Sequence, residues 1–186
     1  REGEATPVFV YTNYPTAELF INGKSYGKQS KNNSSLKSRY RLMWMDAVYE
    51  PGEVKVVAYN KDGKAVAEKT VRTAGKPHHI ELVSNRNELT ADGKDLAYVT
   101  VKVVDKDGNL CPTDSRLIHF SVKGAGKFRA VANGDPTNLE QFHLPKMHAF
   151  HGMLTAIVQA GEIAGDLVLT AKASGVKTGT VHLQAK

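Results

Sequence analysis

Apolar and polar residues alternate along most of the chain, in short runs separated by Gly, Asp, Asn and Pro. The clearest run is 96–104, in which Ala97, Val99, Val101 and Val103 share one face of an extended backbone. A period of two indicates half-buried β-strands, and no run keeps the helical period for more than about two turns. The pattern therefore predicts an all-β protein whose sheets pack face to face.

The first part of the chain contains six or seven such runs. Asn22-Gly23 favours a hairpin between two of them, since both central positions of that tight turn need a positive φ. The polar stretch 29–36 has almost nothing to bury and is expected to be an exposed loop. Strands are predicted at 7–13, 17–21, 24–28, 39–45, 53–59 and 65–73.

Trp44 is the only tryptophan and lies on the run 39–45. Alternation places Tyr40, Leu42 and Trp44 on one face of that run. A Trp on a central strand of a β-sandwich usually fills the space between the two sheets, which predicts a core role. The alternative is an exposed platform on which a sugar ring stacks.

The second part of the chain also consists of alternating runs separated by turn residues, but it does not repeat the sequence of the first part. Between 133 and 150 the alternation fails, which predicts a long irregular loop. Such a loop is either functional or packed down by its own side chains, here Phe142, Leu144, Met147 and Phe150. Strands are predicted at 79–83, 96–104, 117–122, 128–132, 152–159, 165–173 and 177–183.

The stretch 73–77 separates the two parts. Gly75 accepts any backbone conformation, Pro77 fixes its own φ, and Lys76 is biased towards an extended backbone. We therefore predict two β-sandwich domains, at 1–75 and 76–186, docked rigidly across this junction. The smaller domain has little core of its own and is expected to depend on a neighbour.

Composition narrows the functional classes. Hydrophobic residues make up 41% of the 186 positions and charged residues 24%, as in ordinary globular proteins. No stretch approaches the ~20 apolar residues of a membrane-spanning helix, so no membrane partner is expected. The formal net charge is +6, but Lys and Arg are scattered, and the densest set is Lys37, Arg39 and Arg41. This distribution favours solvated strand faces over a nucleic-acid site.

The ends and the single cysteine add two expectations. The chain starts at Arg1 without an initiator Met or a signal peptide, which suggests a piece of a longer protein. Cys111 cannot form an internal disulfide, and no His–Asp arrangement surrounds it in the sequence. A small hydrophobe or loop residue is therefore expected at Cys111 rather than a reactive thiol.

Catalytic signatures are missing from the sequence. Acids occur mostly in turns, as at Asp62, Asp92 and Asp107, where carboxylates cap backbone N–H groups. No Gly-Xaa-Ser-Xaa-Gly elbow, phosphate loop or dinucleotide fingerprint occurs. We therefore expect no catalytic residue and no cofactor in this chain.

Two polar groups in the irregular loop need weighing. His143, His148 and His151 could hold Zn²⁺, but no Cys, Asp or Glu partner has convincing spacing, so histidines at the polar rim of a packed loop are favoured. The turn 133–136 (NGDP) could offer oxygens to Ca²⁺ or to a sugar hydroxyl. Its composition favours a tight turn whose Asn and Asp bond their own backbone.

Several segments resemble a known family. In the first part these are 11–13 (YTN), 17–25 (AELFINGKS) and 49–59 (YEPGEVKVVAY), and 72–77 (RTAGKP) is similar to the junction that follows them. In the second part they are 89–96 (LTADGKDL), 103–109 (VVDKDGN), 133–137 (NGDPT) and 150–152 (FHG). Together they resemble the immunoglobulin-like modules that follow the catalytic barrel in bacterial β-galactosidases of glycoside hydrolase family 2.

The resemblance carries its own implications. It implies two tandem immunoglobulin-like sandwiches, at 1–75 and 76–186, belonging to a larger glycoside hydrolase in the periplasm or outside the cell. The family's acid/base and nucleophile glutamates lie on the barrel, and no position of this chain matches them. The implied partners are that barrel in the same polypeptide and a second copy of the parent enzyme.

Two functions remain open. The first is structural support of the barrel, which predicts bare apolar patches on a domain surface. The second is a carbohydrate-binding module that holds galactose-containing polysaccharide near the active site, which predicts coplanar exposed aromatic rings. The candidate rings for the second function are Trp44, Tyr49, Tyr14 and Tyr26.

Overall fold

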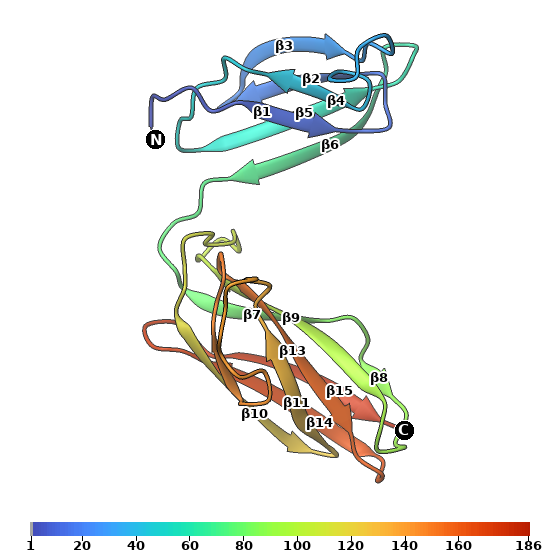
Figure 1. Cartoon of the computed structure of the whole chain (residues 1–186), viewed down its shortest axis with the longest axis vertical. Helices are drawn as coiled ribbons and strands as arrows, with labels where there is room; N and C mark the ends of the chain where they lie inside the picture. The colour runs from blue at the N-terminus through green and yellow to red at the C-terminus, as the bar shows by residue number, and fades with distance from the viewer. Residues whose placement is uncertain (1) are drawn as a thin grey trace. The chain divides into compact units, whose positions relative to one another are not determined.

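The computed structural model describes residues 2–186 and consists of strands, turns and loops. The chain divides into two compact units, one ending at Thr73 and the other spanning Ala74–Lys186. Figure 1 shows the strands of both units, and each unit has its own sheets. No helix in this part of the chain is long and apolar enough to cross a membrane. The all-β prediction from alternation is confirmed.

The first unit is a sandwich of a four-stranded and a two-stranded sheet. Its strands are β1 (Val8–Tyr11), β2 (Thr16–Ile21), β3 (Lys24–Ser30), β4 (Arg41–Trp44), β5 (Glu53–Tyr59) and β6 (Ala65–Arg72). The larger sheet has the order β3-β2-β5-β6, and β1 pairs with β4 across from it. The strands form near the predicted runs, but β3 extends to Ser30, so the first two residues of the stretch 29–36 belong to a strand and not to the predicted loop. The β2–β3 turn has φ of 49° at Asn22 and 79° at Gly23, as the Asn-Gly signal requires.

The core of the first unit is organised around Trp44. The Trp44 side chain is 1% exposed and lies among buried Leu19, Leu42 and Ala58. Its ring Nε1–H donates a hydrogen bond of 3.1 Å to the Gly27 carbonyl oxygen, so its polar atom is satisfied. The core role predicted for Trp44 is confirmed.

The second unit is a larger sandwich of five-stranded and four-stranded sheets. Their orders are β12-β10-β14-β15-β8 and β11-β13-β9-β7. The strands are β7 (His79–Ser84), β8 (Glu88–Leu89), β9 (Leu96–Val104), β10 (Leu117–Gly124), β11 (Gly126–Ala132), β12 (Lys146–His148), β13 (Met153–Ala160), β14 (Gly165–Lys172) and β15 (Gly179–Ala185). The β9 residues Ala97, Val99, Val101 and Val103 are fully buried between the sheets, as their alternation predicted.

Three local expectations were wrong. Tyr40 does not share the buried face of Leu42, because β4 begins at Arg41 and the Tyr40 side chain is 66% exposed. The stretch 133–150 contains a short strand, β12, which pairs with β10. Within that stretch Phe142 and Leu144 are 56% and 37% exposed, so they do not pack the loop down as expected.

The residues after Thr73 belong to the second unit. The Gly75 backbone N–H donates a hydrogen bond of 2.7 Å to Asp105 Oδ2, and Asp105 is 2% exposed. Asp105 also accepts hydrogen bonds from the backbone N–H groups of Asp107 and Asn109, each 2.9 Å long. This buried carboxylate therefore holds the start of the second unit against the turn after β9, a contact that the sequence did not predict.

Candidate functional site

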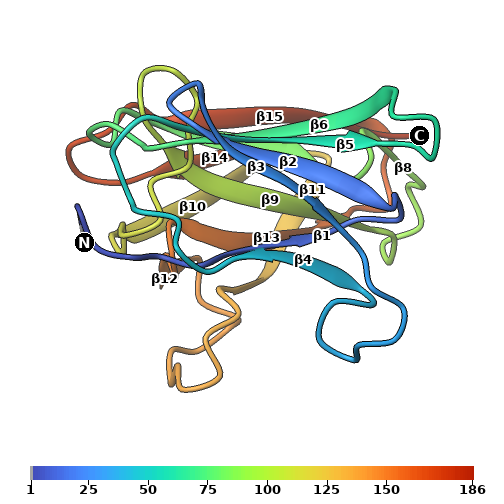
Figure 2. The ribbon, with the colours of Figure 1, turned by 90° about the horizontal axis from the view of Figure 1, so that it is seen from above.

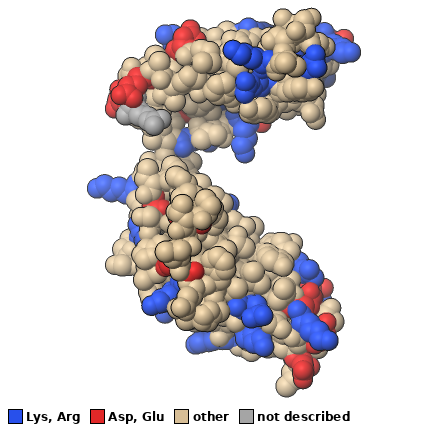
Figure 3. All heavy atoms as spheres, in the orientation of Figure 1, with Lys and Arg blue, Asp and Glu red and all other residues tan. Residues whose placement is uncertain are grey.

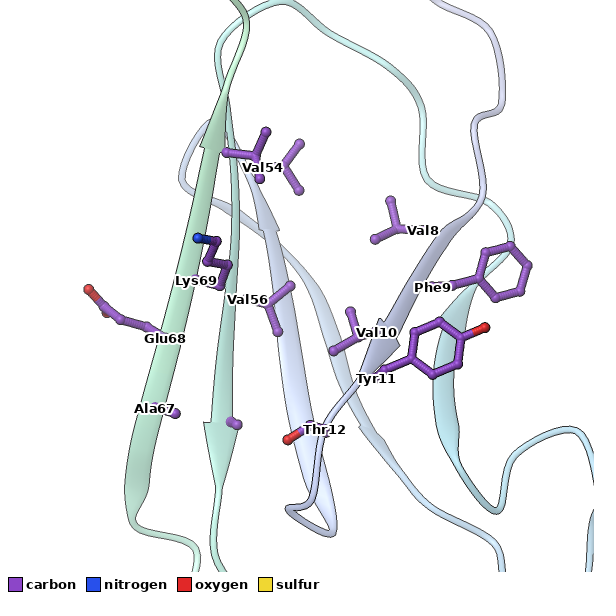
Figure 4. A pocket seen from close by; sticks show the side chains of 12 residues that line it. Val8, Phe9, Val10, Tyr11, Thr12, Val54, Val56, Ala67, Glu68 and Lys69 are labelled. Carbon is purple, nitrogen blue, oxygen red and sulfur yellow. The ribbon is translucent and has the colours of Figure 1, made fainter. Parts of the chain in front are cut away.

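An apolar groove opens along one side of the first unit. Figure 4 shows Val8 and Val10 pointing from β1 towards Val54 and Val56 of β5. The groove has a volume of about 390 Å³, and nine of its lining side chains are aliphatic or aromatic. The full lining is Val8, Phe9, Val10, Tyr11, Thr12, Val54, Val56, Ala58, Ala67, Glu68, Lys69 and Val71.

The groove exists because a two-stranded sheet faces a four-stranded one. The register pairs Val54 with Val71 and Val56 with Lys69, so β6 continues the apolar inner face of β5. β6 is nevertheless largely exposed, and Val71 keeps 61% of its surface in contact with solvent. β1 and β6 each pair with a strand on one side, so two unpaired strand edges border the groove. Exposed edges beside apolar residues are usually covered in folded proteins.

Aromatic residues gather on the outer side of the two-stranded sheet. Phe9 and Tyr11 alternate with the inward valines of β1 and point away from the groove interior in Figure 4. Their side chains are 44% and 69% exposed, and the Arg41 guanidinium lies 5.3 Å from the Phe9 ring. A second hollow of about 370 Å³ is lined by Tyr11, Thr12, Asn13, Lys31 and Tyr40.

The rings singled out for sugar stacking are not brought together. Trp44 is buried, and Tyr26 is half-buried against the same core. Tyr49 is half-buried with its hydroxyl 3.3 Å from Thr73 Oγ1, and Tyr14 is 36% exposed. The strongly exposed rings of this unit, Tyr11 and Tyr40, were missed. Tyr40 lies in the loop before β4, which begins at Arg41. The alternation of apolar and polar residues continues through Tyr40, so it does not show where the strand begins.

The three histidines considered as metal ligands, His143, His148 and His151, are not brought together in a metal-binding group. His148 Nδ1 is 3.0 Å from Glu140 Oε1, and His151 Nδ1 is 3.2 Å from the Pro112 carbonyl oxygen. His143 is exposed. Among residues 2–186 no group of three His, Cys, Asp or Glu side chains is placed to hold a metal ion. The arrangement is that of polar residues at the rim of a loop.

The turn 133–136 bonds its own backbone. Asn133 Oδ1 accepts a hydrogen bond of 3.1 Å from the Asp135 N–H, and Asp135 Oδ1 accepts one of 2.8 Å from the Thr137 N–H. The latter bond, helped by the Thr137 hydroxyl, lowers the pKa of Asp135 below its ordinary value. The structure thus bears out the tight-turn interpretation of this segment.

The loop after this turn ends in an apolar tip. Leu139 is 95% exposed, and Phe142 and Leu144 flank it on the surface. Hydrogen bonds fix its base: the Val131 N–H donates to the Phe142 carbonyl at 2.8 Å, and the His148 N–H donates to Glu140. Figure 2 shows this segment, in orange, extending away from the strands of its own unit. We call residues 138–144 the apolar loop.

Cys111 is 3% exposed and packs in the core of the second unit. Burial raises the pKa of its thiol, and the nearby carboxylates of Asp105 and Asp114 raise it further. A thiol that resists ionisation is a poor nucleophile, so Cys111 is the small hydrophobe that the sequence suggested.

Family comparisons agree with the fold. Residues 80–182 match the model described as glycoside hydrolase family 2 C-terminal domain 5, which covers more than half of the chain. The chain belongs to glycoside hydrolase family 2. Residues 3–67 of this family 2 chain match a domain of unknown function, DUF4982. The resemblance seen in the sequence is therefore confirmed.

Relatives of the family 2 chain are several times longer. The β-galactosidase BoGH2A of Bacteroides ovatus is 42% identical over 95% of this chain, which covers 20% of that protein. A β-galactosidase of Thermoanaerobacter pseudethanolicus is 30% identical over 92% of the chain and 23% of its own length. A solved glycosyl hydrolase family 2 member from Bacteroides cellulosilyticus superimposes with a TM-score of 0.89 at 33% identity, covering 100% of this chain and 23% of that one.

Six carboxyl groups among the described residues have pKa values shifted below their ordinary range. A general acid in glycoside hydrolysis needs a raised pKa. Every carboxyl in residues 2–186 with a resolved shift has a lowered pKa, and hydrogen bonds to the ionised form lower it in each case. These groups are Glu18, Asp92, Asp105, Asp114, Asp135 and Glu140.

Surface charge does not define a site either. On the face shown in Figure 3, Lys and Arg are distributed over both units among uncharged residues. Several basic side chains are engaged locally, as where the Arg116 guanidinium donates to the Asp114 carboxylate at 2.6 Å. The features that stand out are therefore the apolar groove, the Tyr11–Tyr40 hollow and the apolar loop.

Proposed function

We propose that this family 2 chain is a non-catalytic accessory region of a bacterial β-galactosidase. In this role it supports a catalytic barrel that lies outside residues 1–186, in a parent protein located in the periplasm or outside the cell. The observation that carries the proposal is the apolar groove, since a sandwich with an open apolar groove fits a module that is covered by another surface. The occupant that fits is the barrel of the same polypeptide.

The names of the relatives support a role for this chain that does not involve contact with the reacting sugar. A β-glucuronidase of Formosa agariphila is 26% identical over 98% of this chain, and two relatives at 42% and 30% identity are named β-galactosidases. One region is thus shared by enzymes with differently named substrates. A support that does not touch the reacting sugar accounts for this sharing, whereas a substrate-selecting element does not.

The 42% identity to a β-galactosidase favours the same activity for the parent protein. None of the six carboxyl groups with a shifted pKa has the raised pKa of a general acid, which supports placing that activity elsewhere. A retaining glycosidase also needs two carboxyl groups about 5 Å apart in a sugar-lined cleft. The groove has one carboxylate, Glu68, in its lining.

The test compares two valines of β6 in the full-length parent. Val71 lies in the groove lining, and Val66 alternates to the other face of the same strand with 39% exposure. Val71→Glu should lower the melting temperature of the full-length enzyme and the lifetime of its activity on a chromogenic β-galactoside. Val66→Glu should leave both near wild type, because exposed substitutions change stability by only about 0.5 kcal/mol.

Two controls complete the experiment. In the 186-residue chain alone, both substitutions should leave the melting temperature within about 2 °C of wild type, because both sites are then open to water. The same chain should hydrolyse no β-galactoside. Equal behaviour of the two variants in the full-length enzyme contradicts the docking role, and hydrolysis by the chain that is lost on changing one of its own carboxylates contradicts the non-catalytic role.

A further inference from the structure

The Tyr11–Tyr40 hollow shares Tyr11 and Thr12 with the apolar groove, but its other lining residues, Asn13, Lys31 and Tyr40, all carry polar groups. Tyr11 ends β1 and Tyr40 immediately precedes β4, and the pairing of Tyr11 with Arg41 brings the two rings to one end of the two-stranded sheet. Both rings are largely open to solvent, at 69% and 66% exposure. A pair of exposed rings beside a concave surface differs from singly scattered surface tyrosines, which need no explanation.

Polar groups line the same hollow as the two rings. The Lys31 ammonium donates one hydrogen bond to the Thr12 carbonyl oxygen, which orients the side chain and leaves two of its three N–H donors for other partners. The Thr12 hydroxyl oxygen accepts a hydrogen bond of 3.1 Å from the Tyr14 N–H, so its own O–H remains a donor. The exposed Asn13 side chain adds an amide with both donors and an acceptor.

The wall of the hollow is held in place before any ligand binds. The Asn32 N–H donates to the Ser38 carbonyl at 3.2 Å, which closes the loop that leads to Tyr40. The Arg39 guanidinium donates two hydrogen bonds, of 3.0 and 2.9 Å, to the Asn33 carbonyl. A loop that is ordered in advance loses less conformational freedom on binding, which favours affinity.

We propose that this hollow is a sugar-binding site that takes a pyranose unit of a polysaccharide chain. The apolar C–H face of the sugar would lie on a tyrosine ring, and its hydroxyl groups would bond to Lys31, Asn13 and Thr12. The volume of about 370 Å³ falls within the range of small-molecule sites. No carboxylate lines the hollow, so the site admits a neutral sugar or a uronate whose carboxylate pairs with Lys31.

The site goes beyond the support role and uses different residues from those first considered for sugar stacking. Trp44, which is buried, takes no part in it. The proposal also does not depend on the barrel, because the hollow is complete within the first unit. Binding by the 186-residue chain therefore tests it separately from the docking of the groove.

The experiment is affinity electrophoresis of the chain through gels containing soluble galactan or polygalacturonate. We expect one of the two polymers to retard the chain. Tyr11→Ala and Tyr40→Ala should each weaken that retardation about tenfold, as loss of a central aromatic contact does. Tyr14→Ala is the matched control, since Tyr14 is a neighbouring exposed ring outside the hollow, and it should bind as wild type.

The variant Lys31→Gln distinguishes a neutral sugar from a uronate as the ligand. Glutamine keeps N–H donors but has no charge, so the variant should still bind if galactan is the polymer that retards the wild-type chain, and should lose binding if that polymer is polygalacturonate. Far-UV circular dichroism melts establish that each variant is folded. Migration unaffected by both polymers overturns the proposal, as does retardation that survives both Tyr11→Ala and Tyr40→Ala.

Discussion

Replacing Trp44 by alanine should unfold the first unit and leave the second folded. Trp44 is the largest fully buried side chain of the first unit and sits at the centre of a small core. A buried indole removes about 150–250 Å² from water, which at about 25 cal/mol per Å² amounts to about 4–6 kcal/mol. Measured aromatic-to-alanine substitutions in cores cost about 3–5 kcal/mol.

This loss is comparable with the whole stability of the first unit. The unit ends at Thr73. A unit of this length has a free energy of unfolding of roughly 4–11 kcal/mol, at about 0.05–0.15 kcal/mol per residue. The second unit has a separate and larger cluster of buried residues that does not include Trp44. Urea unfolding of Trp44→Ala should therefore show the first transition at very low denaturant or already complete.

The assay is urea titration of the chain followed by far-UV circular dichroism and by amide NMR signals assigned to each unit. Trp44→Phe should lose only about 1–2 kcal/mol, because most of the ring is kept and the freed Gly27 carbonyl lies at an exposed position where water can bind it. Tyr40→Ala, which removes an exposed ring from the same segment, should change the first transition by about 0.5 kcal/mol or less.

One result would refute the reasoning. If Trp44→Ala leaves the first transition within about 1 kcal/mol of wild type, the indole does not organise that core. The wild-type chain offers an independent check, since a buried indole should emit at short wavelength and its emission should not respond to added sugars. A long-wavelength emission that changes with galactan would show that the ring is accessible.

The other predictions concern the second unit. Asp105 has a lowered pKa because the Gly75 N–H and further donors stabilise its ionised form, so its contribution is full above the unfolded pKa of about 4 and is lost as pH falls towards the folded value. Asp105→Asn should lower the melting temperature of this unit at pH 7, and the gap to wild type should narrow below about pH 4 in calorimetric scans; a gap independent of pH contradicts this. Phe142→Ser in the apolar loop should leave the melting temperature of the chain unchanged, because the ring is 56% exposed, yet weaken self-association of the full-length parent in sedimentation velocity if a second copy covers it. Unchanged sedimentation contradicts the covering of the loop by a second copy.

The strands with strict alternation could be predicted because one buried face fixes their register. In β9 a shift of one residue would expose Val99 and Val101 and bury Tyr98 and Thr100, so the pattern permits one arrangement. The Asn22-Gly23 turn was predictable for an equally local reason, since few other residue pairs tolerate positive φ at both positions. Features set by one strand and its own turn are therefore readable from the sequence.

Features set by contacts between distant segments were not readable. β8 has two residues and is defined by its parallel pairing with β15, which no local pattern announces. Asp105 lies in an Asp-Lys-Asp-Gly-Asn turn, a composition typical of exposed turns, and its burial depends on Gly75 some 30 residues earlier in the chain. The exposure of Phe142 was missed because alternation cannot tell a packed loop from a projecting one.

The apolar groove is another feature that depends on contacts between distant segments, so the sequence did not predict it. The apolar groove comes from ordinary alternating strands, and nothing within β1, β5 or β6 distinguishes them from strands of a closed sandwich. The difference lies in the number of strands in each sheet, because two strands cannot cover the inner face of four. The residual apolar face includes Val71, whose burial would contribute about 1–2 kcal/mol on contact with another surface. A module with such a face would gain stability from any surface that covers it, which is the physical reason for proposing a support role.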